Sequence, residues 1–442
     1  MKNFKLLLLL LILTVFVTFV SGCKGGEEEE DGVKLIKIWV HKSEAEDEGK
    51  TYLAIQDNFN DLELTTTDGT LVRMRIEFKN SADTLQTAIN AEVLAGGLPD
   101  IVALDSPNVA AYVDAGILTN VDTYMTQAEI DDFVDSAIEQ GTIDNKIYAL
   151  FAMDAPVGLY YNKTLLQQAS IEPGTLENPW SWNDLFDAMT TLKDEGLTYK
   201  FKGNLGFGGD EGAMYLYSSL IYSAGGLFVG PNGLVSGYLD SEESVNGLKV
   251  VERIFELDSA DSEPWLYNGV NTDALAAGEV AFEMYGPWGI NSIKKNYPEF
   301  ATQYDIMPVP VYEDNLGVKG SLVGGCGSWG FGITTAATNT EAAAIALKYL
   351  TGADSSELLY QSIGTFPTHE SVLENNISFQ SGPLKSLADI LINASSPRPI
   401  LVNYPKLTLA FSKIIAYIEA NSGTEDYDLL NYIQTQIYSV DN

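Results

Sequence analysis

The chain has 442 residues, of which 45% are hydrophobic and 11% aromatic, so it is long enough for two folded domains and is not a disordered protein. It carries 61 acidic against 25 basic residues and a net charge of −36, which argues against nucleic acid and against a polyanionic substrate. Its two cysteines and two histidines are too scattered for a zinc site, and the common zinc-protease, phosphate-loop and serine-hydrolase motifs do not occur, so we expect no metal and no cofactor.

Residues 1–22 have the pattern of an export signal. A short basic start precedes an apolar run over residues 6–20, which is too short to span a bilayer. The run leads into Val-Ser-Gly-Cys at residues 20–23, which resembles the bacterial lipobox, where the signal is cut before a cysteine that is then acylated. We therefore expect a lipid anchor on Cys23 and a solvated acidic tether over residues 23–32. An ordinary signal peptide with a chance cysteine is the alternative.

The next segment, up to residue 116, alternates between strand and helix patterns. The expected elements are strands over 33–40, 71–78 and 100–104, and helices over 49–62, from Ser81 as N-cap, and from Pro107 to Gly116. This β-α-β-α-β order predicts a mostly parallel sheet with helices on both faces, in which ligands bind beyond the carboxyl ends of the strands, where the strand order reverses. The residues that follow the three strands are therefore candidates for ligand binding: 41–44 with His41 and Glu44, Asn80 with Ser81, and Asp105 with Ser106.

The rest of the chain mixes helices and strands, without an internal repeat and without a second run that is long and apolar enough to cross a bilayer. The expected elements are strands over 144–161, a helix that begins at 180–189 with Ser181 as cap, helices over 211–224 and 272–278, a strand and turn over 279–288, an extended segment over 304–312, a helix over 340–351 capped by Thr338, and a mostly helical tail over 405–437.

The segment VGGCGSWGFGITT at residues 323–335 contains a literal G-x-G-x-x-G, the pattern of a dinucleotide-binding turn. That turn requires a strand, a tight turn and then a helix whose N-terminus faces the pyrophosphate. Here strand-like residues follow Gly330, and Trp329 is too bulky for close approach to a pyrophosphate. We therefore interpret the segment as a glycine-rich loop with tight turns that presents Ser328 and Trp329 at a cleft, and we expect Cys326 to be a buried lone thiol.

Enzymatic chemistry finds little support in the residue pattern. Cys326 with His369 would mimic a thiol–imidazole pair, but a lone buried cysteine is the favoured interpretation. The many acidic residues offer pairs for sugar hydrolysis, yet nothing in the sequence singles out one pair.

Five segments of the chain form an ordered set. The first is GGLPDIVALDSPNVAAYVDAGILTNVDTY at residues 96–124. The other four are YALFAMDAPVGLYYNKTLL, PWSWNDLFDAM, LAAGEVAFEMYGPWGI and YDIMPVPVYEDNLGVKGSLVGGCGSWGFGI. Together, in this order, they resemble the maltose-binding type of extracellular solute-binding protein, the large sugar-binding family (family 1) that serves ABC importers. The resemblance covers about residues 33–410 and follows a lipobox.

The resemblance implies an α/β fold of two lobes (the type II periplasmic-binding-protein-like fold), joined by crossing segments and closing on a ligand in the cleft between them. Applied here, the first lobe comprises 33–149 plus 308–352, and the second comprises 150–307 plus 353–442. It further implies a monomer without catalytic activity, held at the extracytoplasmic face of the membrane by Cys23, whose closed form is recognised by the ABC permease subunits.

A sugar has apolar C–H faces and a polar hydroxyl rim, so its receptor needs flat aromatic side chains together with carboxylates and amides. By the resemblance, Trp288 corresponds to the stacking tryptophan of the family, with Tyr285 beside it, whereas Trp39 and Tyr404 fit a core position equally well. The candidate ligand-binding residues are Trp39, His41, Glu44, Asn80, Ser81, Asp105, Ser106, Asp154, Tyr285, Trp288, Ser328, Trp329, Arg398 and Tyr404.

We therefore expect a lipid-anchored receptor that captures a carbohydrate, in the first instance an oligosaccharide, and delivers it to a permease. Two alternatives remain open. One is a receptor for another solute, such as a polyamine or glycerol phosphate; the other is an exported carbohydrate hydrolase.

Overall fold

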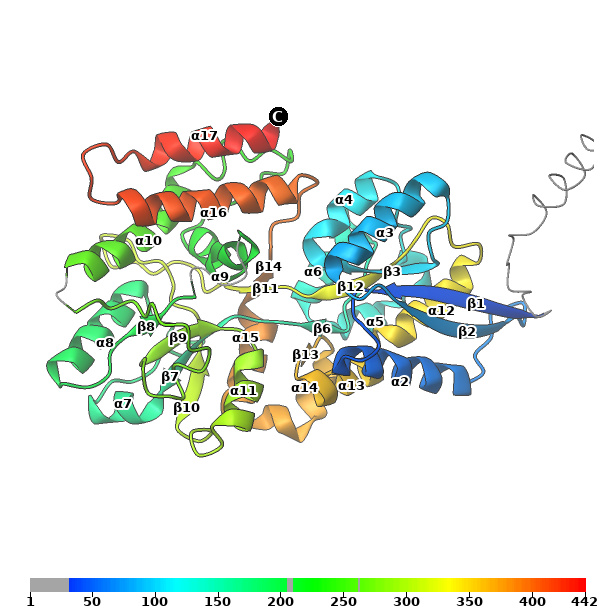
Figure 1. Cartoon of the computed structure of the whole chain (residues 1–442), viewed down its shortest axis with the longest axis horizontal. Helices are drawn as coiled ribbons and strands as arrows, with labels where there is room; N and C mark the ends of the chain where they lie inside the picture. Colours follow the sequence, from blue (N-terminus) through cyan, green and yellow to red (C-terminus); the bar gives the residue numbers. More distant parts are fainter. Residues whose placement is uncertain (1–31, 205–209, 261–262) are drawn as a thin grey trace, which may run out of the picture.

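The computed structural model describes residues 32–204, 210–260 and 263–442, which form two α/β lobes side by side (Figure 1). Each lobe contains a four-stranded sheet with helices packed against it. The predicted fold class, two lobes of α/β structure, is confirmed. The expected signal sequence, Cys23 and the acidic run up to residue 31 lie outside the described residues.

The sheet of the first lobe has the strand order β12-β3-β1-β2. Its strands are β1 (Val33–Val40), β2 (Leu71–Phe78), β3 (Ile101–Asp105) and β12 (Trp329–Ile333). β1 runs parallel to both β2 and β3, and β12 is antiparallel to β3, so the prediction of a mostly parallel sheet is correct. Because β1 lies between β2 and β3, the strand order reverses between β1 and β3.

Four helices of the first lobe were expected from the sequence: α2 (Asp47–Asp61), α3 (Ala82–Ala95), α4 (Val109–Asp114), which follows the turn η1 (Ser106–Asn108), and α12 (Thr340–Leu350). The structure adds η2 (Asp122–Tyr124), α5 (Gln127–Asp131) and α6 (Asp135–Gly141), which the residue pattern did not predict. Ser81 caps α3 by accepting a hydrogen bond from the backbone N–H of Thr84, as predicted, and Gly96 ends the helix with a φ of 76°. The segment from Pro107 begins as a 3₁₀ turn, and α4 ends two residues earlier than the glycine at 116.

The sheet of the second lobe has the order β10-β7-β9-β8. Its strands are β7 (Gly158–Asn162), β8 (Phe201–Lys202), β9 (Phe282–Tyr285) and β10 (Tyr304–Met307). Its helices are α7 (Lys163–Gln168), α8 (Trp182–Asp194), α9 (Asp210–Ser223), α10 (Glu242–Ala260), α11 (Trp288–Asn296), α16 (Tyr404–Asn421) and α17 (Leu429–Asp441). Ser181 and Asp184 form the predicted capping box at the start of α8.

Short paired strands lie where the chain passes between the two lobes. β11 (Gly324–Cys326) runs parallel to β14 (Ser395–Pro397), and β6 (Met153–Asp154) is antiparallel to β13 (Phe366–Pro367). β11 and β14 lie at the centre of Figure 1, between the two four-stranded sheets. The remaining elements are β4 (Thr142–Ile143), β5 (Lys146–Ile147), α13 (Ala353–Ile363), α14 (Glu370–Asn375), η3 (Ile377–Gln380) and α15 (Gly382–Ala394).

The glycine-rich segment was predicted to be a loop with tight turns, and this prediction is wrong. The segment forms two strands, β11 and β12, joined at Gly327 and Ser328. Its glycines serve close packing rather than turning. A Cβ on Gly330 would lie 2.5 Å from the ring of Phe151, and one on Gly332 would lie 2.8 Å from a methyl group of Leu118. Within the segment only Gly327 has a positive φ, of 155°.

Two further predictions are wrong in local detail. Residues 272–278 make a single turn instead of a helix, because Gly278, with a φ of 75°, closes it: the N–H of Glu279 donates to the carbonyl of Ala274. The cap of α12 is Asn339, whose side chain accepts from the N–H of Ala342, and not Thr338, whose hydroxyl accepts from the Lys34 ammonium.

The lobe boundaries stay a proposal, which we amend at one point. α13 packs against α2, and the Thr51 hydroxyl donates to the Ser362 hydroxyl at 2.6 Å, so we place residues 353–363 with the first lobe. None of the helices within the described ranges combines the length and the apolar composition that a membrane crossing requires.

Candidate ligand-binding site

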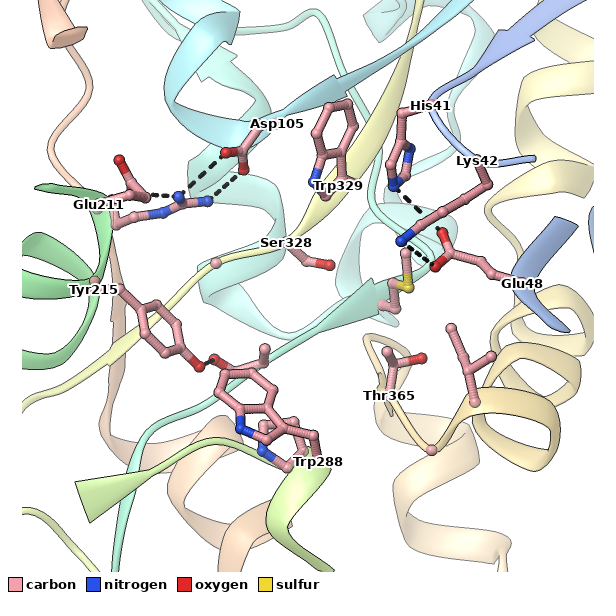
Figure 2. Close-up of a pocket in the computed structure, with 18 residues that line it drawn as sticks. His41, Lys42, Glu48, Asp105, Glu211, Tyr215, Trp288, Ser328, Trp329 and Thr365 are labelled. Carbon is pink, nitrogen blue, oxygen red and sulfur yellow. Dashed lines mark hydrogen bonds and ion pairs between the residues drawn. The ribbon is translucent and has the colours of Figure 1, made fainter. Parts of the chain in front are cut away.

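A pocket of about 370 Å³ lies between the lobes (Figure 2), within the range of roughly 300–1,000 Å³ that small-molecule sites occupy. The first lobe contributes residues that follow β1, end β3 and begin β12, and the second lobe contributes the starts of α9 and α11. The lining residues are His41, Lys42, Glu48, Asp105, Met153, Ala155, Glu211, Gly212, Tyr215, Pro287, Trp288, Gly327, Ser328, Trp329, Ile363, Gly364, Thr365 and Arg398.

The strand order explains which strand ends reach the pocket. His41 and Lys42 follow β1, and Asp105 ends β3, the two strands between which the order reverses. Asn80 and Ser81 follow β2, which is the edge strand on the other side of β1, so the structure places them outside the pocket.

An aromatic pair from the first lobe forms one wall of the pocket. The rings of His41 and Trp329 stack with their centroids 3.7 Å apart and their planes 15° from parallel. Burial, helped by the charge of Lys42, lowers the pKa of His41 to about 3, so the imidazole is neutral at pH 7 and acts as a flat support for the indole. The neighbouring Lys42 ammonium lies 3.2 Å from the Glu48 carboxylate, which also accepts from the Tyr52 hydroxyl.

Trp288 of the second lobe lies across the pocket from Trp329 (Figure 2). It begins α11, directly after Gly286 and Pro287, and a Cβ on Gly286 would lie 2.3 Å from its ring. Tyr285 meets the indole edge to face at 5.4 Å, and the ring of Tyr215 lies 6.0 Å away. The indole is therefore held in place by packing on several sides.

A charged cluster around Arg398 closes one side of the pocket. Its guanidinium donates to the Asp105 carboxylate at 2.5 and 3.3 Å, to the Glu211 carboxylate at 2.5 Å and to the Ser106 hydroxyl at 3.0 Å. The Tyr404 hydroxyl donates to the same Glu211 oxygen at 2.6 Å. Burial acts to lower the pKa of Arg398, but the charges of Asp105 and Glu211 outweigh it and raise that pKa.

Six of the predicted ligand-binding residues line the pocket: His41, Asp105, Trp288, Ser328, Trp329 and Arg398. Three more support lining residues by direct contact: Ser106 bonds to Arg398, Tyr404 bonds to Glu211, and Tyr285 packs on Trp288. These three residues therefore contribute to the site by holding lining residues in place.

The structure places the other five predicted residues outside the pocket lining. Asp154 is fully buried and accepts hydrogen bonds from the side-chain amide of Gln140 and from the backbone N–H of Ala155. It therefore stabilises the segment around β6, where the chain passes between the lobes. Trp39 belongs to the buried core of the first lobe, and its indole N–H donates to Glu77 on the neighbouring strand. Glu44 is exposed, Asn80 occupies a turn with a φ of 66°, and Ser81 is used as a helix cap.

Sequence reasoning missed several lining residues. Lys42 lies within the candidate segment 41–44 but was not singled out, and Glu48 lies on α2, where no sequence signal marked it. Glu211 and Tyr215 are one helical turn apart on α9, and Thr365 lies in a connection; no motif marks these three. Only the folded chain brings them to the pocket.

The groups needed for metal or thiol chemistry do not gather. In the part of the chain that the structure describes, no three metal-binding side chains lie close enough to hold an ion. Cys326 is buried, as predicted. The idea of a thiol–imidazole pair is wrong, because the two ring nitrogens of His369 bond to Asp132 and to the carbonyl of Thr351.

Comparison with known proteins gives one family match and several distant relatives. The sequence profile of the bacterial extracellular solute-binding proteins matches residues 47–357. The maltodextrin-binding protein MdxE of Bacillus subtilis is 25% identical over 225 residues, 49% of this chain and 48% of that protein. The maltotriose-binding protein of Pyrococcus abyssi is 23% identical over 243 residues, 54% and 47% of the two chains. The chain thus spans about half the length of the curated relatives it matches.

Solved structures share the fold over nearly the whole chain. The cyclic alpha-maltosyl-1,6-maltose binding protein from Arthrobacter globiformis matches with a TM-score of 0.74 and 20% identity, over 92% of this chain and 98% of its own. The sugar-binding protein MalE from Xanthomonas citri matches with a TM-score of 0.74 and 14% identity, over 92% and 96%. Since the family profile covers more than half of the chain and the fold agrees, the protein belongs to the bacterial extracellular solute-binding proteins.

Proposed function

We propose that the protein is the receptor of an ABC importer, which captures an uncharged carbohydrate, an oligosaccharide, between its lobes and delivers it unaltered to the permease subunits in the membrane. The single observation that carries the proposal is the pair of tryptophans, one from each lobe, that line opposite sides of the pocket. Two flat apolar surfaces suit the two C–H faces of a sugar ring.

The charges of the pocket support an uncharged guest. The five charged side chains among the described lining residues are paired with one another: Lys42 with Glu48, and Arg398 with both Asp105 and Glu211. A polyamine would have to compete with Lys42 and Arg398 for these carboxylates, and a phosphate would meet three carboxylates. The paired carboxylates instead offer fixed oxygen atoms as hydrogen-bond acceptors for hydroxyl groups.

The distant relatives favour the same solute class. The Bacillus and Pyrococcus proteins are named as binding proteins for maltodextrin and maltotriose, so α-linked glucose oligomers are the first ligands to test. We also propose that Cys23 carries the lipid that anchors the mature protein to a membrane on the extracytoplasmic side, as a monomer.

A thermal-shift screen tests the proposal, with maltose, maltotriose, maltotetraose, spermidine and glycerol 3-phosphate as probes. A sugar present at about 100 times its Kd stabilises the folded state by about 2.7 kcal/mol and raises the Tm by a few degrees. Chromatography of the incubated sugar decides between receptor and hydrolase. A shift with spermidine or glycerol 3-phosphate alone, or shortened sugar in the incubation, would contradict the proposal.

A further inference from the structure

Arg398 occupies a position between the lobes where its backbone has little freedom. It follows β14, one of the segments that run between the lobes, and it is flanked by Pro397 and Pro399, whose rings fix their own φ angles. Its side chain is 5% exposed. The side chain therefore has one well-defined environment rather than a choice of surface rotamers.

The partners of Arg398 come from both lobes. Asp105 and Ser106 lie at the end of β3 in the first lobe, and Glu211 lies on α9 in the second. Glu211 is itself held from α16, because the hydroxyls of Tyr404 and Thr408 donate to its two oxygens at 2.6 and 3.4 Å. The connection thus runs from β3 through the guanidinium to two helices of the second lobe.

Arg398 has no hydrogen-bond donor available to a ligand among the contacts of the described residues. A guanidinium has five N–H groups, and its two terminal nitrogens carry four of them. Four hydrogen bonds from these two nitrogens go to Asp105, Ser106 and Glu211. The fifth donor, on Nε, is buried without a hydrogen-bond partner among the described residues, and the backbone of Gly327 covers it: a Cβ there would lie 2.7 Å from Nε.

We infer that Arg398 is a positioning residue that ties the two lobes together beside the pocket and fixes the carboxylates of Asp105 and Glu211, rather than a residue that contacts the ligand. The tie needs both ends. Lysine has a single nitrogen and no planar fork, so it cannot reproduce the four hydrogen bonds to Asp105, Ser106 and Glu211, and Arg398→Lys keeps the charge while weakening the connection.

Hydrogen exchange on the full protein, without any sugar, tests whether Arg398 connects the two lobes. In Arg398→Lys and Arg398→Met, we expect amides of residues 322–330 and 395–400 to exchange at least tenfold faster, while those of β1 and β7 keep their rates. The matched control is Arg253→Lys, which changes an arginine of the second lobe whose one ion pair within the described residues is with Glu256 on its own helix, at 3.7 Å. Unchanged exchange in both Arg398 variants would overturn the inference.

A milder variant covers the case in which loss of Arg398 prevents folding. Glu211→Gln leaves the bonds of Arg398 to Asp105 and Ser106 in place and weakens the second-lobe end alone. The inference predicts faster exchange in residues 322–330 and 395–400 of this variant. Faster exchange throughout both lobes, or no change, would contradict a local tie.

A second arm rests on the proposed function and asks whether Arg398 touches the sugar. If Arg398 acts only by holding the lobes together, Arg398→Lys raises the Kd for maltose, maltotriose and maltotetraose by one common factor, about tenfold. A loss confined to one of the three would indicate a direct contact and overturn the inference. If none of the three binds the wild-type protein, the proposed function fails, whereas the exchange experiment still decides whether the tie exists.

Discussion

At the scale of single residues, the proposed sugar site depends most on Trp288. Its indole lies across the pocket from Trp329 and is fixed by Gly286, Tyr285 and Tyr215. A rigid aromatic ring that is already in place costs little entropy when a guest stacks on it. The packing that holds the ring is therefore part of the binding site.

We predict that Trp288→Leu weakens the binding of the preferred sugar by on the order of 2 kcal/mol, about thirtyfold in Kd, because the stacking surface is lost. Titration calorimetry measures the change. Trp265→Leu is the matched control: Trp265 also belongs to the second lobe, but its ring packs near Phe186, away from the pocket. Equal affinities in the wild type and Trp288→Leu would rule out stacking on this indole.

His41 gives a prediction about pH. Burial lowers its pKa from 6.5 to about 3, so between these values the unfolded chain binds a proton that the folded chain does not. The folded state therefore loses stability as the pH falls through this window, by up to about 1.4 kcal/mol per pH unit.

Urea unfolding between pH 6.5 and 4.5 checks this contribution. The free energy of unfolding of His41→Gln should fall less steeply with decreasing pH than that of the wild type, because glutamine takes up no proton. Parallel curves for the two proteins would show that His41 titrates normally.

At the scale of elements, the glycines of β12 are set by packing. A Cβ on Gly330 would lie 2.5 Å from the Phe151 ring, which is buried and cannot move aside freely. We predict that Gly330→Ala costs about 1–3 kcal/mol in the free energy of unfolding, measured with urea. In the control, Gly97→Ala, the nearest atom belongs to the flexible end of Glu92, so the cost should be small. Similar losses in both variants would contradict the packing explanation.

The cap of α12 provides a second test at this scale. Asn339→Ala should lower the free energy of unfolding by about 1 kcal/mol, because the N–H of Ala342 loses its acceptor. Thr338→Ala removes only an exposed bond to Lys34 and should have a much smaller effect. If Thr338→Ala proved the more damaging of the two in thermal unfolding, the assigned cap would be wrong.

Elements were easier to predict than their arrangement. The first three strands and the cap of α3 follow from alternation and from the residue Ser81, which are local signals. The strand order is not local: because β2 is an edge strand, Asn80 and Ser81 miss the pocket although their position after a strand resembles that of His41. The glycine-rich segment was misjudged for the same reason, since the side chains that require glycine come from distant parts of the chain.

The site residues also fall into those that a sequence signal marks and those that only the fold brings to the pocket. Trp288 and Asp105 could be found, because a resemblance and a strand end mark them. Glu211 and Tyr215 could not, because helical spacing looks the same for a pocket wall and for a core face. The role inferred for Arg398 also depends on partners from both lobes, which no sequence pattern reveals.

At the scale of the whole molecule, the proposed function requires that the two lobes open and close about the segments that run between them. The pocket takes walls from both lobes, so a guest that touches both stabilises the closed form. The proposed lipid on Cys23 would keep this motion next to the permease.

Cys23→Ser tests the anchor. We predict that the variant takes up no radiolabelled palmitate in cells, whereas the wild type is labelled and stays with the membrane fraction. Cys326→Ser is the control, because that thiol is buried and should not affect labelling. Labelling of Cys23→Ser would show that the lipid is attached elsewhere.

A crystal structure of the protein with the sugar that gives the largest thermal shift would show where and how the ligand binds. We predict an intact oligosaccharide with one ring between Trp288 and Trp329 and its hydroxyl groups on the carboxylates of the pocket. A sugar bound elsewhere on the molecule, or one cleaved in the cleft, would contradict this prediction.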